Sequence, residues 1–162
     1  MAERYTVRVT KDYLVFCSGH FITYDGTECE RLHGHNYRAA VEVDSPLDTN
    51  HYVFDFVALK NIMRRLTDEI DHYLLVPMNS KLIAVEVTEK RVRLTFGEKE
   101  WIVPRADCVL LPVENTTAEL LAKYLADRLR DELRDAHRFV PEAVRVEVEE
   151  SFGQTARYEW RR

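Results

Sequence analysis

Two histidines separated by a single residue form the pattern in this chain that most directly suggests chemistry. His33, Gly34 and His35 open a stretch that alternates in polarity as far as about Asp44. On a β-strand this spacing places both imidazoles on one face, in line with an otherwise apolar row. Buried imidazoles are costly unless their nitrogens are paired, and a metal ion would pair both. The alternative is a turn whose histidines are simply hydrogen-bonded.

A third histidine completes a candidate zinc site. His20 ends a strand-like stretch that we expect to pair beside the strand of His33 and His35. Gly34 lets a neighbouring backbone approach closely at this point. Zinc accepts neutral imidazoles, and three of them with one open position form a catalytic arrangement. We therefore expect His20, His33 and His35 to bind Zn²⁺.

Three further polar residues could transfer protons. Cys29 lies four residues before His33, and beside a metal its thiolate would be stabilised and could act as a base or nucleophile. Otherwise it is an incidental loop cysteine. Asp71 and His72 close a predicted helix and could form a proton relay. The alternative is that His72 only favours the negative end of the helix dipole.

A carboxylate continues an apolar strand face near the end of the chain. Glu150 has the same parity as Val144, Val146 and Val148, whereas the intervening residues are charged. A carboxylate on a buried face needs a partner, and a ligand with two adjacent N–H donors would supply one. Alternatively, the strand ends at Glu149 and Glu150 faces water.

Periodicity predicts the elements that carry these residues. Asp55 can cap a helix that begins at Phe56 and has an apolar stripe to Ile70. Thr116 and Glu119 match a capping box at the start of a second helix. The lack of regular βαβ alternation favours an α+β fold with an antiparallel sheet. The expected strands span residues 4–9, 13–17, 33–44, 82–87, 91–96, 101–103 and 143–150.

Length and composition favour a single domain over residues 1–162, with a β-rich insert at about 78–111. The net charge of −5 argues against a nucleic-acid partner. A membrane span or an apolar signal core is not expected from any stretch of the sequence. The three cysteines form no CxxC pair, so we expect a reduced, cytoplasmic protein in which Cys17 and Cys108 are core thiols.

Six segments, in order, resemble the 6-pyruvoyl-tetrahydropterin synthase / 6-carboxytetrahydropterin synthase family. The segment CERLHGHNY is similar to the family pattern C-x3-HGH-N-[YF], and FCSGHF to its zinc-ligand segment F-S-A-A-H. The other four similar segments are VFDFVALK, EIDHYLL, ENTTAELLAKYL and VEVEESFGQTARY. The resemblance runs from Phe16 to Tyr158 and leaves out only the insert. Thr116 stands where the family usually has proline.

The resemblance implies the tunnelling fold, in which antiparallel sheets and helix pairs assemble into a barrel. It also implies a homohexamer, a dimer of trimers, with active sites at subunit interfaces. The matching positions imply zinc ligands at His20, His33 and His35, and proton-transfer groups at Cys29, Asp71 and His72. They also imply a pterin anchor at Glu150 and a main-chain contact to the ring at Thr117.

The implied substrate is 7,8-dihydroneopterin triphosphate, and the favoured product is 6-carboxytetrahydropterin of the 7-deazaguanine (queuosine) route. Two other lyase products stay open, 6-pyruvoyl-tetrahydropterin and 6-hydroxymethyl-dihydropterin. Glu30 bears on the latter, because some relatives use a glutamate near this point; a solvated loop glutamate is the alternative. A non-catalytic pterin- or purine-binding protein is the candidate from another class, although binding alone needs neither the thiol nor the relay.

Overall fold

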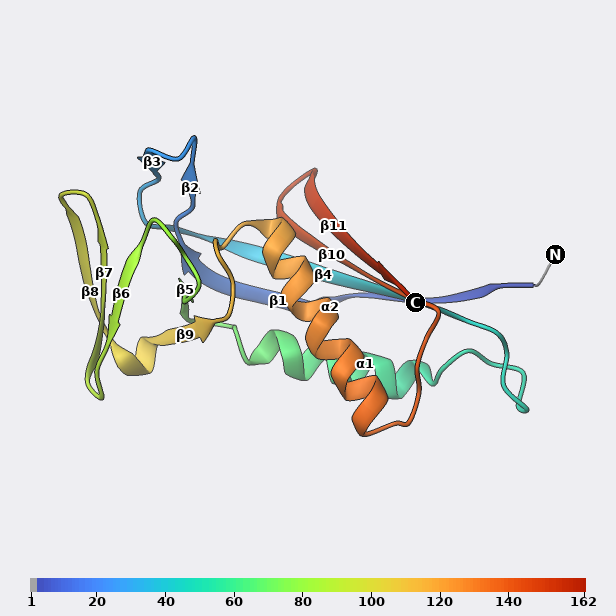
Figure 1. Ribbon diagram of the computed structural model, residues 1–162. Helices are drawn as coiled ribbons and strands as arrows, with labels where there is room; N and C mark the ends of the chain where they lie inside the picture. The colour runs from blue at the N-terminus through green and yellow to red at the C-terminus, as the bar shows by residue number, and fades with distance from the viewer. Residues whose placement is uncertain (1–2) are drawn as a thin grey trace.

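The computed structural model describes residues 3–162 (Figure 1). Its two α-helices are α1 (Phe56–Asp68) and α2 (Ala118–Asp135), and a short 3-10 turn, η1, spans Arg105–Asp107. The six strands of the main sheet are β1 (Tyr5–His20), β4 (His33–Ser45), β5 (Leu74–Pro77), β9 (Cys108–Leu111), β10 (Ala143–Ser151) and β11 (Gln154–Arg161). The remaining strands are β2 (Thr23–Tyr24), β3 (Glu28–Cys29), β6 (Ala84–Val87), β7 (Arg91–Phe96) and β8 (Lys99–Pro104).

The main sheet has the strand order β11-β10-β4-β1-β5-β9. The four strands β11, β10, β4 and β1 pair antiparallel, whereas β5 and β9 add to the edge in parallel. Helix α1 packs against β1, and α2 packs against β10 and β11, so both helices cover one face of the sheet (Figure 1). This mostly antiparallel sheet with two helices confirms the expected α+β fold.

Strands β1 and β4 position the three histidines. Their antiparallel register pairs His20 with His33 and Gly19 with Gly34. The sequence predicted two separate strands before His20, but the chain forms one long strand with a register shift between Thr10 and Val15. Such an irregularity lets a strand bend while it keeps pairing with its neighbour.

The core lies between the sheet and the helices. Along β4 the residues that share the parity of His35 are buried: Tyr37, Ala39, Val41 and Val43. Val144, Val146 and Val148 of β10 are likewise fully buried. Both predicted apolar rows are therefore confirmed. The row on β4 leads to His35 and the row on β10 leads to Glu150, and these two residues lie at the same end of the sheet.

The helix caps agree with the sequence in one case and differ in the other. Asp55 caps α1, where its Oδ1 accepts from the N–H groups of Val57 at 2.6 Å and Ala58 at 3.3 Å. For α2 the predicted capping box at Thr116 and Glu119 is wrong, because Thr117 is the N-cap. Thr116 instead faces inward and is fully buried.

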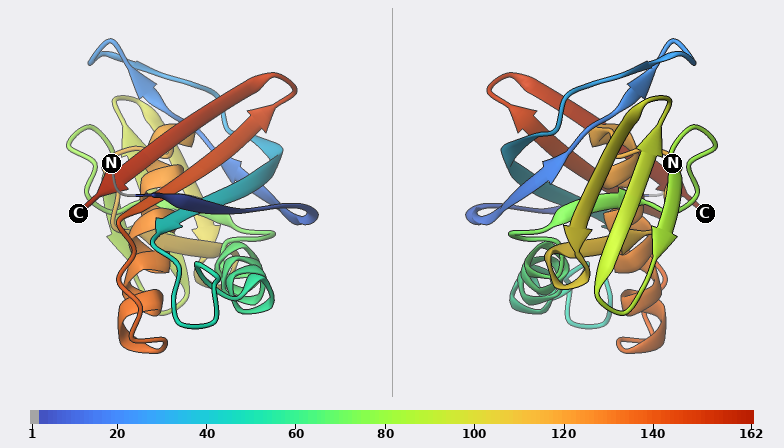
Figure 2. Two further views of the ribbon diagram at one scale, coloured as in Figure 1. Left: turned by 90° about the vertical axis from the view of Figure 1, so that its right-hand side faces the viewer. Right: turned by 90° about the vertical axis from the view of Figure 1, so that its left-hand side faces the viewer.

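The chain between the helices forms a second, three-stranded sheet in the order β6-β7-β8 (Figure 2). The sequence predicted these three strands but did not predict that β5 and β9, on either side of them, join the main sheet. Cys108, at the start of β9, is buried as expected, whereas Cys17 is exposed and its predicted core position is wrong. No helix within residues 3–162 is long and apolar enough to cross a membrane.

Candidate metal-centred site

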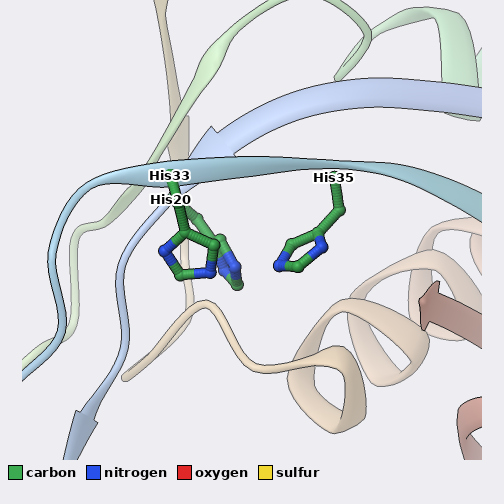
Figure 3. Close-up of side chains that lie close together, drawn as sticks. All are labelled: His20, His33 and His35. Atoms are coloured by element: carbon green, nitrogen blue, oxygen red, sulfur yellow. The ribbon is translucent and has the colours of Figure 1, made fainter.

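The three histidines predicted as metal ligands converge on one point. Their ring nitrogens can be chosen so that one atom of each lies within 4.8 Å of the others. His33 and His35 project from the same side of β4, and His20 reaches the same place from the end of β1 (Figure 3). The ring centroids of His20 and His33 are 4.7 Å apart, and those of His33 and His35 are 4.8 Å apart.

Main-chain carbonyls fix the proton positions on two of these rings. Nδ1 of His20 lies 2.9 Å from the carbonyl oxygen of Thr116, and Nδ1 of His33 lies 2.8 Å from that of Arg31. A carbonyl can only accept, so each Nδ1 carries the hydrogen and donates it. In the neutral ring Nε2 then holds the lone pair, which is the tautomer that a metal-binding histidine needs when its other nitrogen is held by an outer partner.

The lone pair of His20 is not satisfied by the protein. The His20 side chain is 1% exposed, and its Nε2 has no hydrogen-bond partner within residues 3–162. Burial lowers the pKa of His20, and the Thr116 hydrogen bond and the Glu150 charge offset this only in part, so the ring stays neutral at pH 7. A buried, unpaired acceptor costs free energy that a bound cation would recover.

Glu150 brings a carboxylate to the same point. Its Oε1 lies 3.4 Å from Nε2 of His20 and 3.9 Å from Nε2 of His35. The hydroxyl of Tyr37 donates to this oxygen at 3.5 Å, and burial together with the Glu150 charge raises the pKa of Tyr37, which keeps that hydroxyl protonated. Within residues 3–162, the unpaired Nε2 of His20 thus lies beside a carboxylate oxygen that accepts one long hydrogen bond, and nitrogen and carboxylate donors of this kind fit a divalent cation such as Zn²⁺.

The two residues predicted to contact a ring-shaped ligand line one hollow, and Glu150 connects this hollow to the histidines. Glu150 and Thr117 lie in the wall of a hollow of about 410 Å³, which is within the usual size range of small-molecule sites. The N-terminal end of α2 and the β10–β11 hairpin form most of its lining. The sequence-based pairing of these two positions therefore corresponds to a shared surface.

Cys29 does not join the histidines. Its side chain is 7% exposed and packs in an apolar cluster with Phe21, Leu74 and residues of β7. The thiol donates only a long hydrogen bond, 3.5 Å, to the carbonyl oxygen of Glu30. Burial raises the pKa of this thiol, and the nearby Lys99 charge opposes the shift only in part. The thiolate form is therefore disfavoured at neutral pH.

Glu30, the next residue, does face the histidines. Its Oε2 lies 3.9 Å from Nε2 of His33 and accepts from the N–H of Ile22 at 3.4 Å. The main chain adds a second tie, because the N–H of Glu30 donates to the carbonyl oxygen of Ile22 at 3.0 Å. The spacing E-x-x-HGH was the sequence signal for this position.

Asp71 and His72 form a close pair at another place on the chain. Oδ2 of Asp71 lies 2.7 Å from Nδ1 of His72, and its Oδ1 accepts from the N–H of Cys17 at 2.7 Å. The backbone of His72 has a φ of 63°, a strained conformation held by its N–H bond of 2.6 Å to the carbonyl oxygen of Cys17. Its ring is 79% exposed, and no hydrogen bond or ion pair joins it to the three histidines within residues 3–162.

Thr116 was predicted to cap a helix, but in the structure it orients a histidine of the site. Its carbonyl oxygen orients His20, and its hydroxyl donates to the carbonyl oxygen of Phe21 at 3.0 Å. Asn115 extends this link, because its Nδ2 donates to the carbonyl oxygen of Thr23 at 2.8 Å. A role played by a main-chain carbonyl does not depend on the side chain, so the residue type could not predict it. The threonine in place of the family's usual proline was the sequence feature that set position 116 apart.

The chain is similar in sequence to a known family and to named members of it. Residues 8–161 match the family model described as 6-pyruvoyl tetrahydropterin synthase. A protein of Methanocaldococcus jannaschii, provisionally named a 6-carboxy-5,6,7,8-tetrahydropterin synthase, is 33% identical over 146 residues, which cover 90% of this chain and 89% of the relative. The 6-carboxy-5,6,7,8-tetrahydropterin synthase of Aquifex aeolicus is 33% identical over 126 residues, covering 74% and 69% respectively.

The fold of the chain is also similar to that of solved structures. The 6-pyruvoyltetrahydropterin synthase of Plasmodium vivax superposes with a TM-score of 0.90 at 26% identity, covering 99% of this chain and 100% of that one. Variants of the same protein carry alanine or cysteine in place of a glutamate described as a catalytic residue. The 6-pyruvoyl tetrahydropterin synthase of Caenorhabditis elegans superposes with a TM-score of 0.61 at 18% identity, which shows a shared fold.

Proposed function

The chain belongs to the 6-pyruvoyl tetrahydropterin synthase family, and from this premise we propose that it is a 6-carboxy-5,6,7,8-tetrahydropterin synthase. The proposed substrate is 7,8-dihydroneopterin triphosphate, whose side chain is cleaved with uptake of one water molecule and release of triphosphate and acetaldehyde. The names of its sequence relatives support this product. The observation that carries the proposal is the convergence of three histidine nitrogens beside a hollow lined by Glu150 and Thr117.

The proposed cofactor is one Zn²⁺ held by His20, His33 and His35. The unpaired Nε2 of buried His20 and the two carbonyl-fixed tautomers support this assignment. Zinc bound here would supply Lewis acidity toward the hydroxyl groups of the substrate side chain. The histidines and the carbonyl oxygens of Thr116 and Arg31 keep the ligand nitrogens oriented.

Glu150 and Thr117 are proposed to hold the pterin ring. A carboxylate accepts two N–H bonds at once, which matches the amino and N3–H donors of a pterin. In the structure Oε1 of Glu150 faces His20 and His35, so binding would turn the carboxylate from the histidines toward the ring edge. Anchoring the ring would fix the side chain above the histidines, an orientation effect on the rate.

Proton transfer on the His33 side is proposed to involve Glu30 as well as Cys29. The resemblance favours Cys29, but its thiol is buried in an apolar cluster and has a raised pKa. Glu30 has a carboxylate 3.9 Å from His33 Nε2 and two ties to Ile22 that limit its motion. We therefore assign the base to Glu30 in this conformation, with Cys29 requiring a shift of its loop before it could take part.

Asp71 and His72 are proposed to serve the reaction of a neighbouring subunit in a homohexamer. His72 is 79% exposed, and its aligned, carboxylate-paired ring has the form of a proton relay that still lacks its substrate. A subunit interface would bring this pair to the histidines of the next chain. Helix α1 ends at Asp68 with Glu69 as its C-cap, so the prediction that His72 closes the helix is wrong, and its strained backbone supports a different role.

A side-chain-cleaving lyase that gives 6-hydroxymethyl-dihydropterin is the second candidate. Glu30 favours it, since its carboxylate faces the histidine site. The Plasmodium vivax 6-pyruvoyltetrahydropterin synthase, in which a glutamate is described as a catalytic residue, supports a catalytic role for such a residue and leaves the product open. For either product the proposed setting is the cytoplasm, in keeping with three free thiols, Cys17, Cys29 and Cys108.

Product analysis of two single variants separates the candidates. Metal-loaded wild type, Glu30→Gln and Cys29→Ala would each be incubated with 7,8-dihydroneopterin triphosphate and the pterins identified by mass spectrometry. We expect wild type to form 6-carboxytetrahydropterin with an equal amount of acetaldehyde, and Glu30→Gln to lose most of the rate. A hydroxymethyl product from wild type would replace the first candidate by the second, and full activity in Glu30→Gln would return the base to Cys29.

A further inference from the structure

The three-stranded sheet β6–β8 has no part in the proposed reaction. It shares an apolar cluster with the loop that connects His20 to His33, and this cluster is distinct from the main core. Val92 and Leu94 of β7 contribute fully buried side chains to it, and Phe21 and Cys29 contribute from the loop. Figure 2 shows the small sheet standing against one end of the molecule.

An aromatic stack links this sheet to the first histidine. The ring of Trp101, in β8, lies on that of Phe21 with centroids 4.4 Å apart and planes 17° from parallel. Phe21 directly follows His20 and is 3% exposed. Its carbonyl oxygen accepts from the hydroxyl of Thr116, whose own carbonyl holds Nδ1 of His20. Displacing the Phe21 ring would therefore disturb the main chain that orients His20 from two directions.

A lysine links the same sheet to the loop that carries the proposed base. Nζ of Lys99, at the start of β8, donates to the carbonyl oxygen of Cys29 at 2.5 Å. Cys29 pairs with Thr23 in the β2–β3 ribbon, and Glu30 follows at once. The ammonium group thus fixes the backbone one residue before the carboxylate that faces His33, in a charge-assisted bond of the stronger kind.

The outward side of the small sheet has a different character. Ile102 is 54% exposed, and on that surface Arg93 forms ion pairs with Glu86 and Glu100. The contacts that reach the histidine loop come from the opposite side of the sheet. This separation provides a control residue, Ile102, next to Trp101 in sequence but on the face that does not touch the loop.

We infer that the β6–β8 sheet is a brace that sets the position of His20 and Glu30, with Trp101 and Lys99 as its positioning residues. The kinetic part of this inference rests on the proposed function, whereas the metal-binding part does not. Trp101 acts on His20 through Phe21 and Thr116. Lys99 acts on Glu30 through the carbonyl of Cys29.

Zinc affinity and steady-state kinetics of Trp101→Ala, Lys99→Met and Ile102→Ala test the brace. Apoprotein would be titrated with Zn²⁺ against a chromophoric chelator, and kcat and KM measured after reloading. We expect Trp101→Ala to weaken zinc binding about 10- to 100-fold, as loss of outer support to a ligand does. We expect Lys99→Met to keep zinc affinity but to lower kcat by roughly tenfold or more, with little change in KM.

Conservative variants distinguish positioning from loss of folding. Trp101→Phe keeps an aromatic ring on Phe21, and Lys99→Arg keeps a cation at the Cys29 carbonyl, so each should recover most of the wild-type value. Ile102→Ala should stay within about twofold of wild type in every readout. If Trp101→Ala does not fold, Lys99→Met still carries the test, because it leaves the apolar cluster intact.

The inference is overturned if Trp101→Ala and Lys99→Met match Ile102→Ala in both zinc affinity and kcat. A wild-type protein that forms no pterin product would instead refute the proposed function. In that case the zinc titration of Trp101→Ala still decides whether the brace supports His20.

Discussion

Nδ1 of His20 lies 2.9 Å from the carbonyl oxygen of Thr116, although the two residues are 96 positions apart in the chain. This bond ties the end of β1 to the residue before the N-cap of α2. It leaves the buried Nε2 of His20 directed at the other histidines with its lone pair free. One main-chain oxygen thus sets both the orientation and the tautomer of a ligand.

The paired glycines at the histidine end of the sheet should respond differently to substitution. A Cβ on Gly34 would lie 3.1 Å from the carbonyl oxygen of Ser18, whereas one on Gly19 would meet nothing closer than 3.6 Å. We expect Gly34→Ala to cost about 1–3 kcal/mol of unfolding free energy, because β1 and β4 must separate. Gly19→Ala is the matched control and should change it by less than about 0.5 kcal/mol.

Denaturant unfolding and zinc titration of the two glycine variants check this prediction. The separation of β1 and β4 would move His20 away from His33, so Gly34→Ala should also bind zinc more weakly. Equal stability and equal zinc affinity in both variants would show that the close approach at Gly34 is unimportant.

The three thiols should differ in reactivity. Cys17 is exposed, whereas Cys29 and Cys108 are buried, and burial raises the pKa of both buried thiols. A raised pKa lowers the thiolate fraction at any pH below it, so alkylation at pH 8 should modify Cys17 first and the other two much more slowly. Peptide mapping after timed iodoacetamide treatment measures this order. Modification of Cys29 as fast as Cys17 would show that its loop opens readily and would strengthen its candidacy as the base.

Mixed oligomers test the proposed sharing of sites between subunits. His33→Ala removes a ligand, and His72→Ala removes the proposed relay, so each variant alone should lose about 10²-fold or more of the wild-type kcat. Co-expressed, the two should regain part of the activity, because an intact histidine site in one chain can meet an intact Asp71–His72 pair in another. His33→Ala co-expressed with Glu30→Gln is the control, since both changes fall within one chain's site, and it should stay inactive. Equal activity in the two mixtures would contradict the shared site.

A buried ion pair on the other face of the sheet should carry part of the stability. Asp44 is 1% exposed and accepts two bonds from Arg145, at 2.7 and 2.6 Å. Asp44→Asn removes the most buried of the three carboxylates around Arg145, and because Glu159 and Glu42 still face the guanidinium it should cost about 1–3 kcal/mol. Asp131→Asn, which alters an exposed pair with Arg134, should cost less than about 1 kcal/mol.

The same pair predicts a direction of pH dependence. The hydrogen bonds from Arg145, opposed in part by burial, hold the pKa of Asp44 below its ordinary value. Its contribution is therefore complete above the unfolded-state pKa of about 3.9 and is lost as the pH falls through the lower folded-state pKa. Wild type should lose stability in this acid range by more than Asp44→Asn does. Parallel pH profiles of the two proteins, measured by thermal unfolding, would contradict this assignment.

The site was predictable where a side chain's role follows from its own strand. The parity of His33 and His35 with Tyr37, and of Glu150 with Val148, was enough to place them on the core-bearing face of β4 and β10, although the expected burial is wrong for His33, whose side chain is 39% exposed. The convergence of His20 with them required only that adjacent strands pair. These are local rules, and they hold whatever covers the sheet.

Burial that depends on distant packing was not predictable in the same way. The position of Cys29 is decided by β7 and β8, some 70 residues away, and Cys17 is exposed although the three residues before it are apolar. From the sequence, the short apolar runs of β5 and β9 could equally belong to the insert. Their place in the main sheet follows from the pairing of β5 with β1 and of β9 with β5, which the sequence does not reveal. Thr117 replaces Thr116 as the cap because the Thr116 hydroxyl is taken by the carbonyl of Phe21.

In the proposed reaction, His20, His33 and His35 hold a metal at which a pterin side chain is cleaved. The most direct measurement compares product formation from 7,8-dihydroneopterin triphosphate by apoprotein, by apoprotein reloaded with one equivalent of Zn²⁺, and by His33→Ala treated in the same way. We predict 6-carboxytetrahydropterin and acetaldehyde from the reloaded wild type and almost none from the other two. Equal turnover in all three samples, or no pterin product from any, would contradict the account.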